Sequence, residues 1–240
     1  MALNSIFDAW RRRGLPTGRR ALQCSQSSYS QFAEDLIAHT IFGNTYRTGR
    51  YLDIGCFDPQ KWSNTYRFYQ QGWQGVCIDP NDAFASLWKK HRPRDLFLNM
   101  AVSDEHGSRT YLKYEGIPQG NRLEESDLPS PGKHDAQSVP CDSLLNILNQ
   151  HWEAGREMDL MSIDCEGHDL TILHSGDFER YRPRVLIVED HAHLKHSPID
   201  DFCEAAEYKL LGFSAKSKLY GDRRWMATRN PKTSGQAANT

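Results

Sequence analysis

Two acidic residues follow neighbouring apolar runs in the first third of the chain. Asp53 lies in the run YLDIG, which ends at Gly55, and Asp79 closes the later run GVCID. If both runs are parallel strands, these residues lie at the carboxyl edge of a sheet, where α/β proteins bind ligands. Gly55 allows a tight turn against a ligand, and Asp79 can accept hydrogen bonds from both hydroxyls of a ribose. With Asp53 placed to meet a cationic amino or sulfonium group, the pair predicts a site for an adenosine-bearing molecule.

The glycine pattern after Asp53 narrows the choice of ligand. The run continues as IGCFDP and contains no G-x-G-x-x-G, the pattern that places a pyrophosphate on a helix N-terminus. This disfavours NAD and FAD and favours S-adenosylmethionine. Two alternatives stay open at this point: a nicotinamide-dependent oxidoreductase and a non-catalytic domain that binds an adenosine ligand.

A second group of acids follows two later apolar runs. Asp164 and Glu166 come after MDLMSI, and Glu189 and Asp190 come after VLIV. If these runs are adjacent parallel strands, their acids meet in one cleft. Clustered carboxylates suit Mg²⁺ or another hard divalent cation, so Asp164, Glu189 and Asp190 are the predicted metal ligands. The alternative is a set of loop acids in salt bridges.

His168 is the predicted general base. It follows Asp164 and Glu166 in SIDCEGHD, at the expected start of a helix. The helix dipole there lowers the pKa of an imidazole and favours its neutral, proton-accepting form. A hydroxyl acceptor needs such a base because an alcohol is a weak nucleophile at neutral pH. We therefore predict His168, Asp164 and Glu166 as the catalytic group; the alternative for His168 is an ordinary residue on a helix surface.

Apolar runs typical of strands alternate with segments of helical periodicity from Ser30 onward. This order predicts an α/β fold with mostly parallel strands covered by helices on both faces. Near the end of the chain, residues 213–220 and 223–229 are expected to form two strands joined at Gly221-Asp222. We therefore predict the Rossmann-like class I methyltransferase fold, a three-layer αβα sandwich whose seven-stranded sheet ends in an antiparallel hairpin.

The chain divides into three parts. Residues 1–28 are predicted as an N-terminal arm with a helix and a linker, residues 29–230 as the methyltransferase domain, and residues 231–240 as a flexible tail. Inside the domain, the stretch 114–137 is rich in Gly, Pro and Glu. It is predicted as a polar loop insertion that covers the molecule accepting the methyl group. The side chains expected to bind a polyhydroxylated acceptor there are Asn121, Arg122, Glu124 and Glu125.

Composition disfavours several classes of protein. The 240 residues carry a formal net charge of -2, so no strong basic field recruits nucleic acid or an anionic membrane. No apolar run reaches the roughly 20 residues that span a bilayer, and the N-terminus lacks the order of a signal peptide. Six cysteines are scattered without a C-x-x-C pair, which predicts reduced thiols and a cytoplasmic location. The oligomeric state does not follow from these features.

Four blocks of the sequence resemble the FkbM-type methyltransferases. They are YSQFAEDLI at 29–37, the segment from YLDIGCFDP to CIDPN at 51–81, AVSDEHG at 101–107, and the segment 158–189. The resemblance implies transfer of a methyl group from S-adenosylmethionine to an oxygen, typically a hydroxyl of a sugar or of a polyketide-like product. The implied partner is a small-molecule or glycan acceptor.

The resemblance also implies roles for individual residues. The implied cofactor pocket comprises Asp53, Gly55, Asp79, Ser103 and Asp164, with walls from Gln31, Asp35, Ser63 and Asn64. Asp164, Glu166 and Glu189 would face the acceptor. One departure is Cys56-Phe57, where many relatives have a small residue followed by Asn or His, and it affects the contacts expected just after the glycine.

Overall fold

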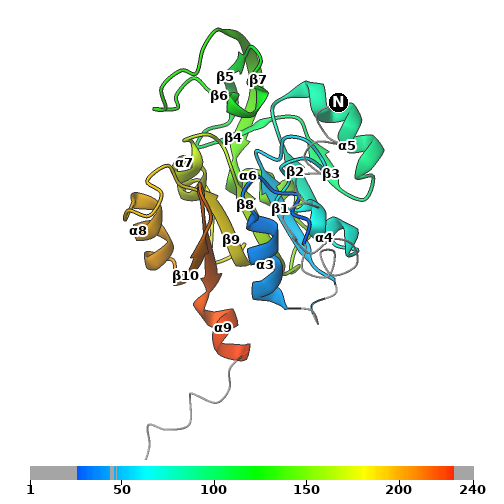
Figure 1. The fold of residues 1–240 in the computed structure, drawn as a ribbon, viewed down its shortest axis with the longest axis vertical. Coiled ribbons are helices and arrows are strands. Elements are labelled where there is room, and N and C mark those ends of the chain that lie inside the picture. Colours follow the sequence, from blue (N-terminus) through cyan, green and yellow to red (C-terminus); the bar gives the residue numbers. More distant parts are fainter. Residues whose placement is uncertain (1–25, 44–45, 47, 230–240) are drawn as a thin grey trace, which may run out of the picture.

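The computed structural model describes residues 26–43, 46 and 48–229, which form two sheets with helices around the larger one (Figure 1). The predicted tail lies outside the described residues, as does all but the end of the predicted N-terminal arm. The helices are α3 (Glu34–Phe42), α4 (Tyr66–Gln70), η1 (Asp82–Phe84), α5 (Ala85–His91), η2 (Pro118–Gly120), α6 (Leu144–His151), α7 (Asp169–His174), α8 (Pro198–Ala205) and α9 (Arg223–Arg229). The strands are β1 (Arg50–Ile54), β2 (Gln74–Ile78), β3 (Leu96–Leu98), β4 (Ala101–Ser103), β5 (Gly107–Tyr114), β6 (Arg122–Leu123), β7 (His134–Ser143), β8 (Met158–Ile163), β9 (Pro183–Glu189), β10 (Tyr208–Phe213) and β11 (Ser217–Asp222).

The large sheet has seven strands in the order β10-β11-β9-β8-β1-β2-β3. Strands β1, β2, β3, β8 and β9 are parallel, whereas β11 runs antiparallel to both β9 and β10. From β1 the chain builds outward through β2 and β3, and it then returns to add β8 and β9 on the other side of β1. The direction reverses between β1 and β8, and such a switch point is where open α/β sheets bind ligands. This topology confirms the predicted Rossmann-like fold.

Alternate residues of a strand point to opposite faces of the sheet, and each face here has its own helices. Leu52 and Ile54 of β1 pack in one cluster with buried residues of α6, α7 and α8. Tyr51 packs on the other face with buried residues of α3, α4 and α5. In α8 the buried Ile199 and Cys203 are spaced as the apolar stripe of a helix requires. The sandwich therefore has the three predicted layers.

The terminal hairpin is present, but its predicted position was wrong. Its strands are β10 and β11, and the turn between them is closed by backbone hydrogen bonds between Ser214 and Ser217 of 2.8 and 3.2 Å. Residues 223–229, predicted as a strand, form helix α9. Trp225 of this helix packs beside Phe42 of α3, with ring centroids 5.8 Å apart. A segment this short is compatible with both the helical and the strand periodicity, and the tertiary contact decides which structure forms.

The stretch 114–137 was predicted as a loop, and that prediction was wrong where η2, β6 and the start of β7 form. Strands β5 and β7 pair from Gly107↔Cys141 to Tyr114↔His134, and with β4 and β6 they form a second sheet in the order β4-β7-β5-β6. The first residues of β7 are polar and exposed, so this strand lacks the apolar alternation by which strands are recognised. The small sheet lies beyond one end of the large sheet, at the top of Figure 1.

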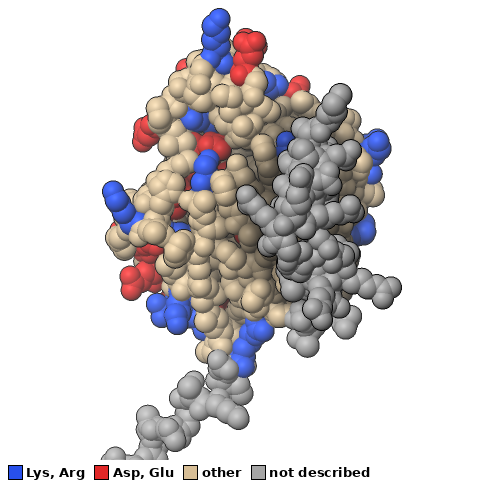
Figure 2. Space-filling view, viewed as in Figure 1, with Lys and Arg blue, Asp and Glu red and all other residues tan. Residues whose placement is uncertain are grey.

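Within the described part of the chain, no helix combines the length and apolar character needed to cross a membrane. On the face drawn in Figure 2, charged side chains of both signs are mixed. The free cysteines in the described chain are Cys56, Cys77, Cys141, Cys165 and Cys203.

Candidate active site

A cavity opens where the ends of β1, β2 and β8 meet the small sheet. The loops after these strands line it with Gly55, Asp79, Asp164, Glu166 and His168. The small sheet and its connections add Tyr111, Gln119, Asn121, Arg122 and Leu123. Gln31, predicted as a wall, lies there as well. Of the strand-end residues predicted from the sequence, the five that follow β1, β2 and β8 thus share one cavity, whereas Asp53, Glu189 and Asp190 do not line it.

Asp79 presents a buried carboxylate to this cavity. Its two oxygens accept backbone hydrogen bonds from Phe57 and Asn81, both 2.8 Å long. Burial raises the pKa of Asp79 to about 6, against the lowering effect of these two bonds. Each carboxylate oxygen has a second lone pair, which remains available to a ligand hydroxyl. This pair of acceptors fits the two hydroxyls of a ribose.

Gly55 allows the ends of β1 and β8 to approach each other closely at this edge of the sheet. Its φ is +73°, and a Cβ at this position would stand 1.8 Å from the carbonyl oxygen of Asp164. Any side chain would therefore force β1 and β8 apart at the switch point. The glycine brings the backbone of both loops to the wall of the cavity, as the sequence predicted from its position.

Asp164 and Glu189 form a hydrogen-bonded carboxyl pair at the ends of β8 and β9. Burial, followed by the charge of Glu189, raises the pKa of Asp164 well above its ordinary value. Burial also acts to raise the pKa of Glu189, but hydrogen bonding to His191 and the charge of Lys216 lower it overall. A proton held by this pair therefore favours Asp164 over Glu189.

Glu166 stands beside this pair and lines the cavity. Its backbone is left-handed, with φ 49°, and its amide donates a 3.1 Å hydrogen bond to Glu189. Burial first, and then the negative charge of Glu189, raise the pKa of Glu166 to about 7. A carboxyl with this pKa exchanges its proton near neutrality, which is the property required of a general base.

His168 is buried, lies directly before α7 and lines the same cavity. Its Nε2 is 3.3 Å from the hydroxyl oxygen of Ser103. Burial lowers the pKa of His168, although nearby Glu125 and Asp104 oppose this effect. The imidazole is therefore neutral at pH 7, as predicted, with desolvation as the principal cause. Ser103, predicted as a cofactor contact, is engaged by this imidazole.

Asp190 does not join the predicted metal ligands, so that part of the prediction was wrong. Its carboxylate pairs with the ammonium of Lys218 at 2.8 Å and accepts a 2.5 Å hydrogen bond from Ser197. Because Asp190 follows Glu189 directly, the two side chains leave the strand in opposite directions. Glu166, Glu189 and His191 do approach one another, with one potential ligand atom of each within 4.8 Å of the others.

Residues 46–210 match the model of the family described as the methyltransferase FkbM domain. The chain belongs to this family. The match covers more than half of the chain, and it confirms the resemblance seen in the sequence. It also makes this FkbM domain an S-adenosylmethionine-dependent methyltransferase. A search of curated proteins finds no match.

Solved structures of similar fold include three methyltransferases. A TehB-like S-adenosylmethionine-dependent methyltransferase from Corynebacterium glutamicum has 11% identity and a TM-score of 0.40, covering 93% of this chain and all of its own. A methyltransferase FkbM from Methylobacillus flagellatus KT has 8% identity and a TM-score of 0.45, covering 73% of this chain and 44% of its own. The Burkholderia thailandensis 1,6-didemethyltoxoflavin-N1-methyltransferase, solved with its substrate and S-adenosylhomocysteine, has 11% identity and a TM-score of 0.38, covering 91% and 85%.

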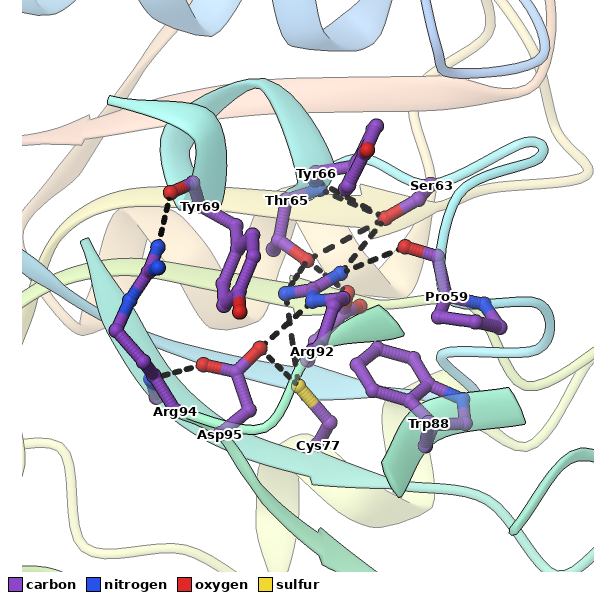
Figure 3. A network of polar contacts seen from close by, with 12 residues as sticks. Pro59, Ser63, Thr65, Tyr66, Tyr69, Cys77, Trp88, Arg92, Arg94 and Asp95 are labelled. Atoms are coloured by element: carbon purple, nitrogen blue, oxygen red, sulfur yellow. Dashed lines mark hydrogen bonds and ion pairs between the residues drawn. The ribbon is translucent and has the colours of Figure 1, made fainter. Parts of the chain in front are cut away.

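Two predicted cofactor residues of the FkbM domain, Asp53 and Ser63, are buried and do not line the cavity. Ser63 belongs to a network around Arg92 (Figure 3). Arg92 is 1% exposed and pairs with Asp95 at 2.6 Å. Its remaining N–H groups reach the oxygens of Ser63, Thr65, Tyr51 and Pro59. Asp53 accepts a 2.5 Å hydrogen bond from Thr65, and burial raises its pKa to about 6. The network therefore holds the loop after β1 in a fixed position.

The other predicted wall residues of the FkbM domain also have structural partners. Asp35 accepts hydrogen bonds from Ser28, Ser30, the amide of Tyr29 and the guanidinium of Arg67. Asn64 donates a 3.0 Å hydrogen bond to Ser162 of β8. The contacts of Asp35 hold the segment before α3, which carries Gln31 into the cavity wall.

Several lining residues were not predicted from the sequence. Phe57 and Trp62 stack with ring centroids 5.9 Å apart at the cavity wall, both with positive φ. Tyr111 belongs to β5 and reaches the cavity because the small sheet folds over it. The departure at Cys56-Phe57 was the one signal that pointed to this wall. Tyr111 gave none, because its place depends on a strand pairing that the sequence did not predict.

Proposed function

We propose that this FkbM domain transfers the methyl group of S-adenosylmethionine to a hydroxyl oxygen of a small molecule, either a sugar or glycan or a polyketide-like metabolite. The observation that carries the proposal is the place of Glu166. It lines the same cavity as Asp79, and burial beside Glu189 raises its pKa to about 7. A hydroxyl acceptor requires a base with such a pKa next to the methyl donor.

The cavity offers a separate wall for each part of the cofactor. Asp79 would accept hydrogen bonds from the ribose hydroxyls, and the apolar side chains of Ile78, Met100 and Val102 would contact the adenine. The carboxylate of Glu166, once it has lost its proton, would attract the sulfonium, which carries a positive charge that the product lacks. Asp53 acts in this proposal through the loop after β1, because Thr65 and Arg92 hold it away from the cavity.

The proposed reaction is a direct displacement at the methyl carbon. The acceptor hydroxyl gives its proton to the carboxylate of Glu166, and its oxygen forms a bond to the methyl carbon as the carbon–sulfur bond breaks. The bonding electrons remain on sulfur, so neutral S-adenosylhomocysteine leaves. His168 is the second proposed base: its neutral imidazole lines the same cavity, with Ser103 as its hydrogen-bond partner.

A divalent cation is not part of the proposed mechanism. Glu189 is common to the predicted metal ligands and to the group of Glu166, Glu189 and His191, and it already accepts from the amide of Glu166 and pairs with His191 and Lys216 at 3.2 and 3.4 Å. The acid that the sequence placed beside it, Asp190, is occupied by Lys218.

A reducing compartment such as the cytoplasm remains the proposed location, supported by the free thiols of the described chain.

Titration calorimetry with S-adenosylmethionine, S-adenosylhomocysteine and NAD tests the cofactor. We expect the first two to bind and NAD to give no heat; binding of NAD alone would favour the oxidoreductase alternative. Methyl-labelled cofactor is then offered with a panel of glycosides and hydroxylated polyketides. Glu166→Gln is expected to lower transfer by about 10²- to 10⁴-fold with cofactor binding retained, whereas Lys113→Gln, which removes a surface ion pair with Asp82, should leave it unchanged. Full transfer by Glu166→Gln would exclude this base.

A further inference from the structure

Arg122, in β6 of the small sheet, is a buried cation with an incomplete set of partners. It is 7% exposed and lines the cavity. The one hydrogen bond of its side chain among the described residues runs from Nη2 to the carbonyl oxygen of Leu128 at 2.8 Å. No carboxylate of the described chain lies within ion-pairing distance of it, although a guanidinium has five N–H donors. Buried charges in proteins are normally paired, so a binding partner is missing.

Other buried cations of the described chain show the contrast. Arg92 is paired with Asp95 at 2.6 Å, and Lys218 is paired with Asp190 and Asp200 at 2.8 and 2.6 Å. Neither of these groups lines the cavity. The cation that faces the cavity is the one without a carboxylate, which is the arrangement expected of a ligand-binding group.

The surroundings of Arg122 place it at the end of the cavity that holds Glu166. The turn that follows β6 is fastened there, because the hydroxyl of Ser126 donates a 2.6 Å hydrogen bond to the carbonyl oxygen of Glu166. The charge of Arg122 also acts on Glu166, where it opposes the larger effect of burial on the pKa. The guanidinium lies over the ring of Tyr114, 5.2 Å from its centroid, and this contact supports the cation without neutralising it.

We propose that Arg122 binds an anionic group, a carboxylate or a phosphate, inside the cavity of this FkbM domain. A guanidinium suits such groups because its parallel N–H donors match two of their oxygens. The proposal rests on the proposed function, since it assigns one end of the same site. Two sources supply this chemistry: the carboxylate in the methionine part of the cofactor, or an acidic substituent of the acceptor, such as a uronate or a sugar phosphate.

Three ligands separate the two sources. S-adenosylhomocysteine carries the carboxylate, 5′-methylthioadenosine lacks it, and inorganic phosphate is added to protein saturated with S-adenosylhomocysteine as a probe for an acidic acceptor. Each is titrated into the wild type, Arg122→Gln, Arg122→Lys and the control Lys113→Gln, which removes a positive charge from the same sheet outside the cavity. The thermal midpoint of each free variant shows whether it is folded.

If the cofactor is the source, Arg122→Gln weakens S-adenosylhomocysteine binding about tenfold to hundredfold and leaves 5′-methylthioadenosine unchanged. If the acceptor is the source, both nucleosides bind normally, and the stabilisation by phosphate seen in the wild type is lost in Arg122→Gln and partly retained in Arg122→Lys. The free Arg122→Gln protein should melt at or above the wild-type temperature, because an unpaired buried charge is removed.

Unchanged binding of all three ligands by Arg122→Gln overturns the proposal. It is equally overturned if both nucleosides weaken together and the free variant melts at a lower temperature, because Arg122 is then a structural residue. A wild-type protein that binds neither nucleoside refutes the proposed function instead, and in that case phosphate binding to the free protein still tests Arg122.

Discussion

Replacing Glu166 by Gln should change how the stability of the fold depends on pH. The pKa of Glu166 rises from 4.5 to about 7 on folding, chiefly through burial. Between these values the folded chain binds more protons than the unfolded chain, so this group lowers the free energy of unfolding as pH rises through that window. The carboxamide does not titrate, and the variant therefore escapes this loss.

The magnitude follows from the two pKa values. Each pKa unit corresponds to about 1.4 kcal/mol, and most of the shift is expressed between about pH 5 and pH 8. The stability difference between Glu166→Gln and the wild type should therefore be about 2–3 kcal/mol larger at pH 8 than at pH 5. Taking this difference between two pH values removes any constant effect of the carboxamide on packing.

Urea unfolding followed by tryptophan fluorescence measures this quantity, because Trp73 and Trp88 are buried in the core. Wild type, Glu166→Gln and the control Glu204→Gln, which changes an exposed residue of α8, are unfolded at several pH values between about 5 and 8. The control should follow the wild type throughout. If Glu166→Gln also runs parallel to the wild type, Glu166 is ionised in the fold at neutral pH and the reasoning about the base fails.

Three further changes test other parts of the site. Asp79→Asn should weaken both S-adenosylhomocysteine and 5′-methylthioadenosine about tenfold or more by calorimetry, because the ribose hydroxyls lose a charged acceptor; unchanged affinity would place the ribose elsewhere. Arg92→Met should lower the free energy of unfolding by about 3–5 kcal/mol, since it leaves Asp95 buried without its partner, and a loss below about 1 kcal/mol would contradict the role of Arg92 in holding the loop after β1. The affinity for S-adenosylmethionine relative to S-adenosylhomocysteine should rise between about pH 6 and pH 8, because Asp79 and Glu166, with pKa values of about 6 and about 7, lose protons and attract the sulfonium. A ratio that does not change with pH would separate these acids from the sulfonium.

Local pattern was sufficient for the parallel part of the fold and for the edge where the ligand binds. The runs that end before Gly55, Asp79 and Asp164 have the length and apolar content of buried strands, and the structure forms strands there. A rule of topology then places their ends in one crevice, and the cavity is found at that place. Glu166 and His168 could be predicted with them because they follow the same strand within a few residues.

The direction of each side chain was harder to predict. Asp53 lies on the Tyr51 face of the sheet and turns toward Thr65, although its position near the strand end suggested a ligand contact. Glu189 and Asp190 separate because successive residues of an extended chain point to opposite sides. The alternation along the strand was a signal in the sequence that would have excluded a metal site using both acids.

By itself, the sequence determined the Rossmann-like sheet, the family and the acids at the strand ends, because these depend on periodicity and on residues close together in the chain. Only the tertiary structure decided what covers them. The small sheet pairs residues as distant as Gly107 and Cys141, and this pairing brings Tyr111 and Arg122 over the cavity. Desolvation in that enclosure also raises the pKa of Glu166 to about 7. Burial is a property of the assembled fold, and no local pattern of residues encodes it.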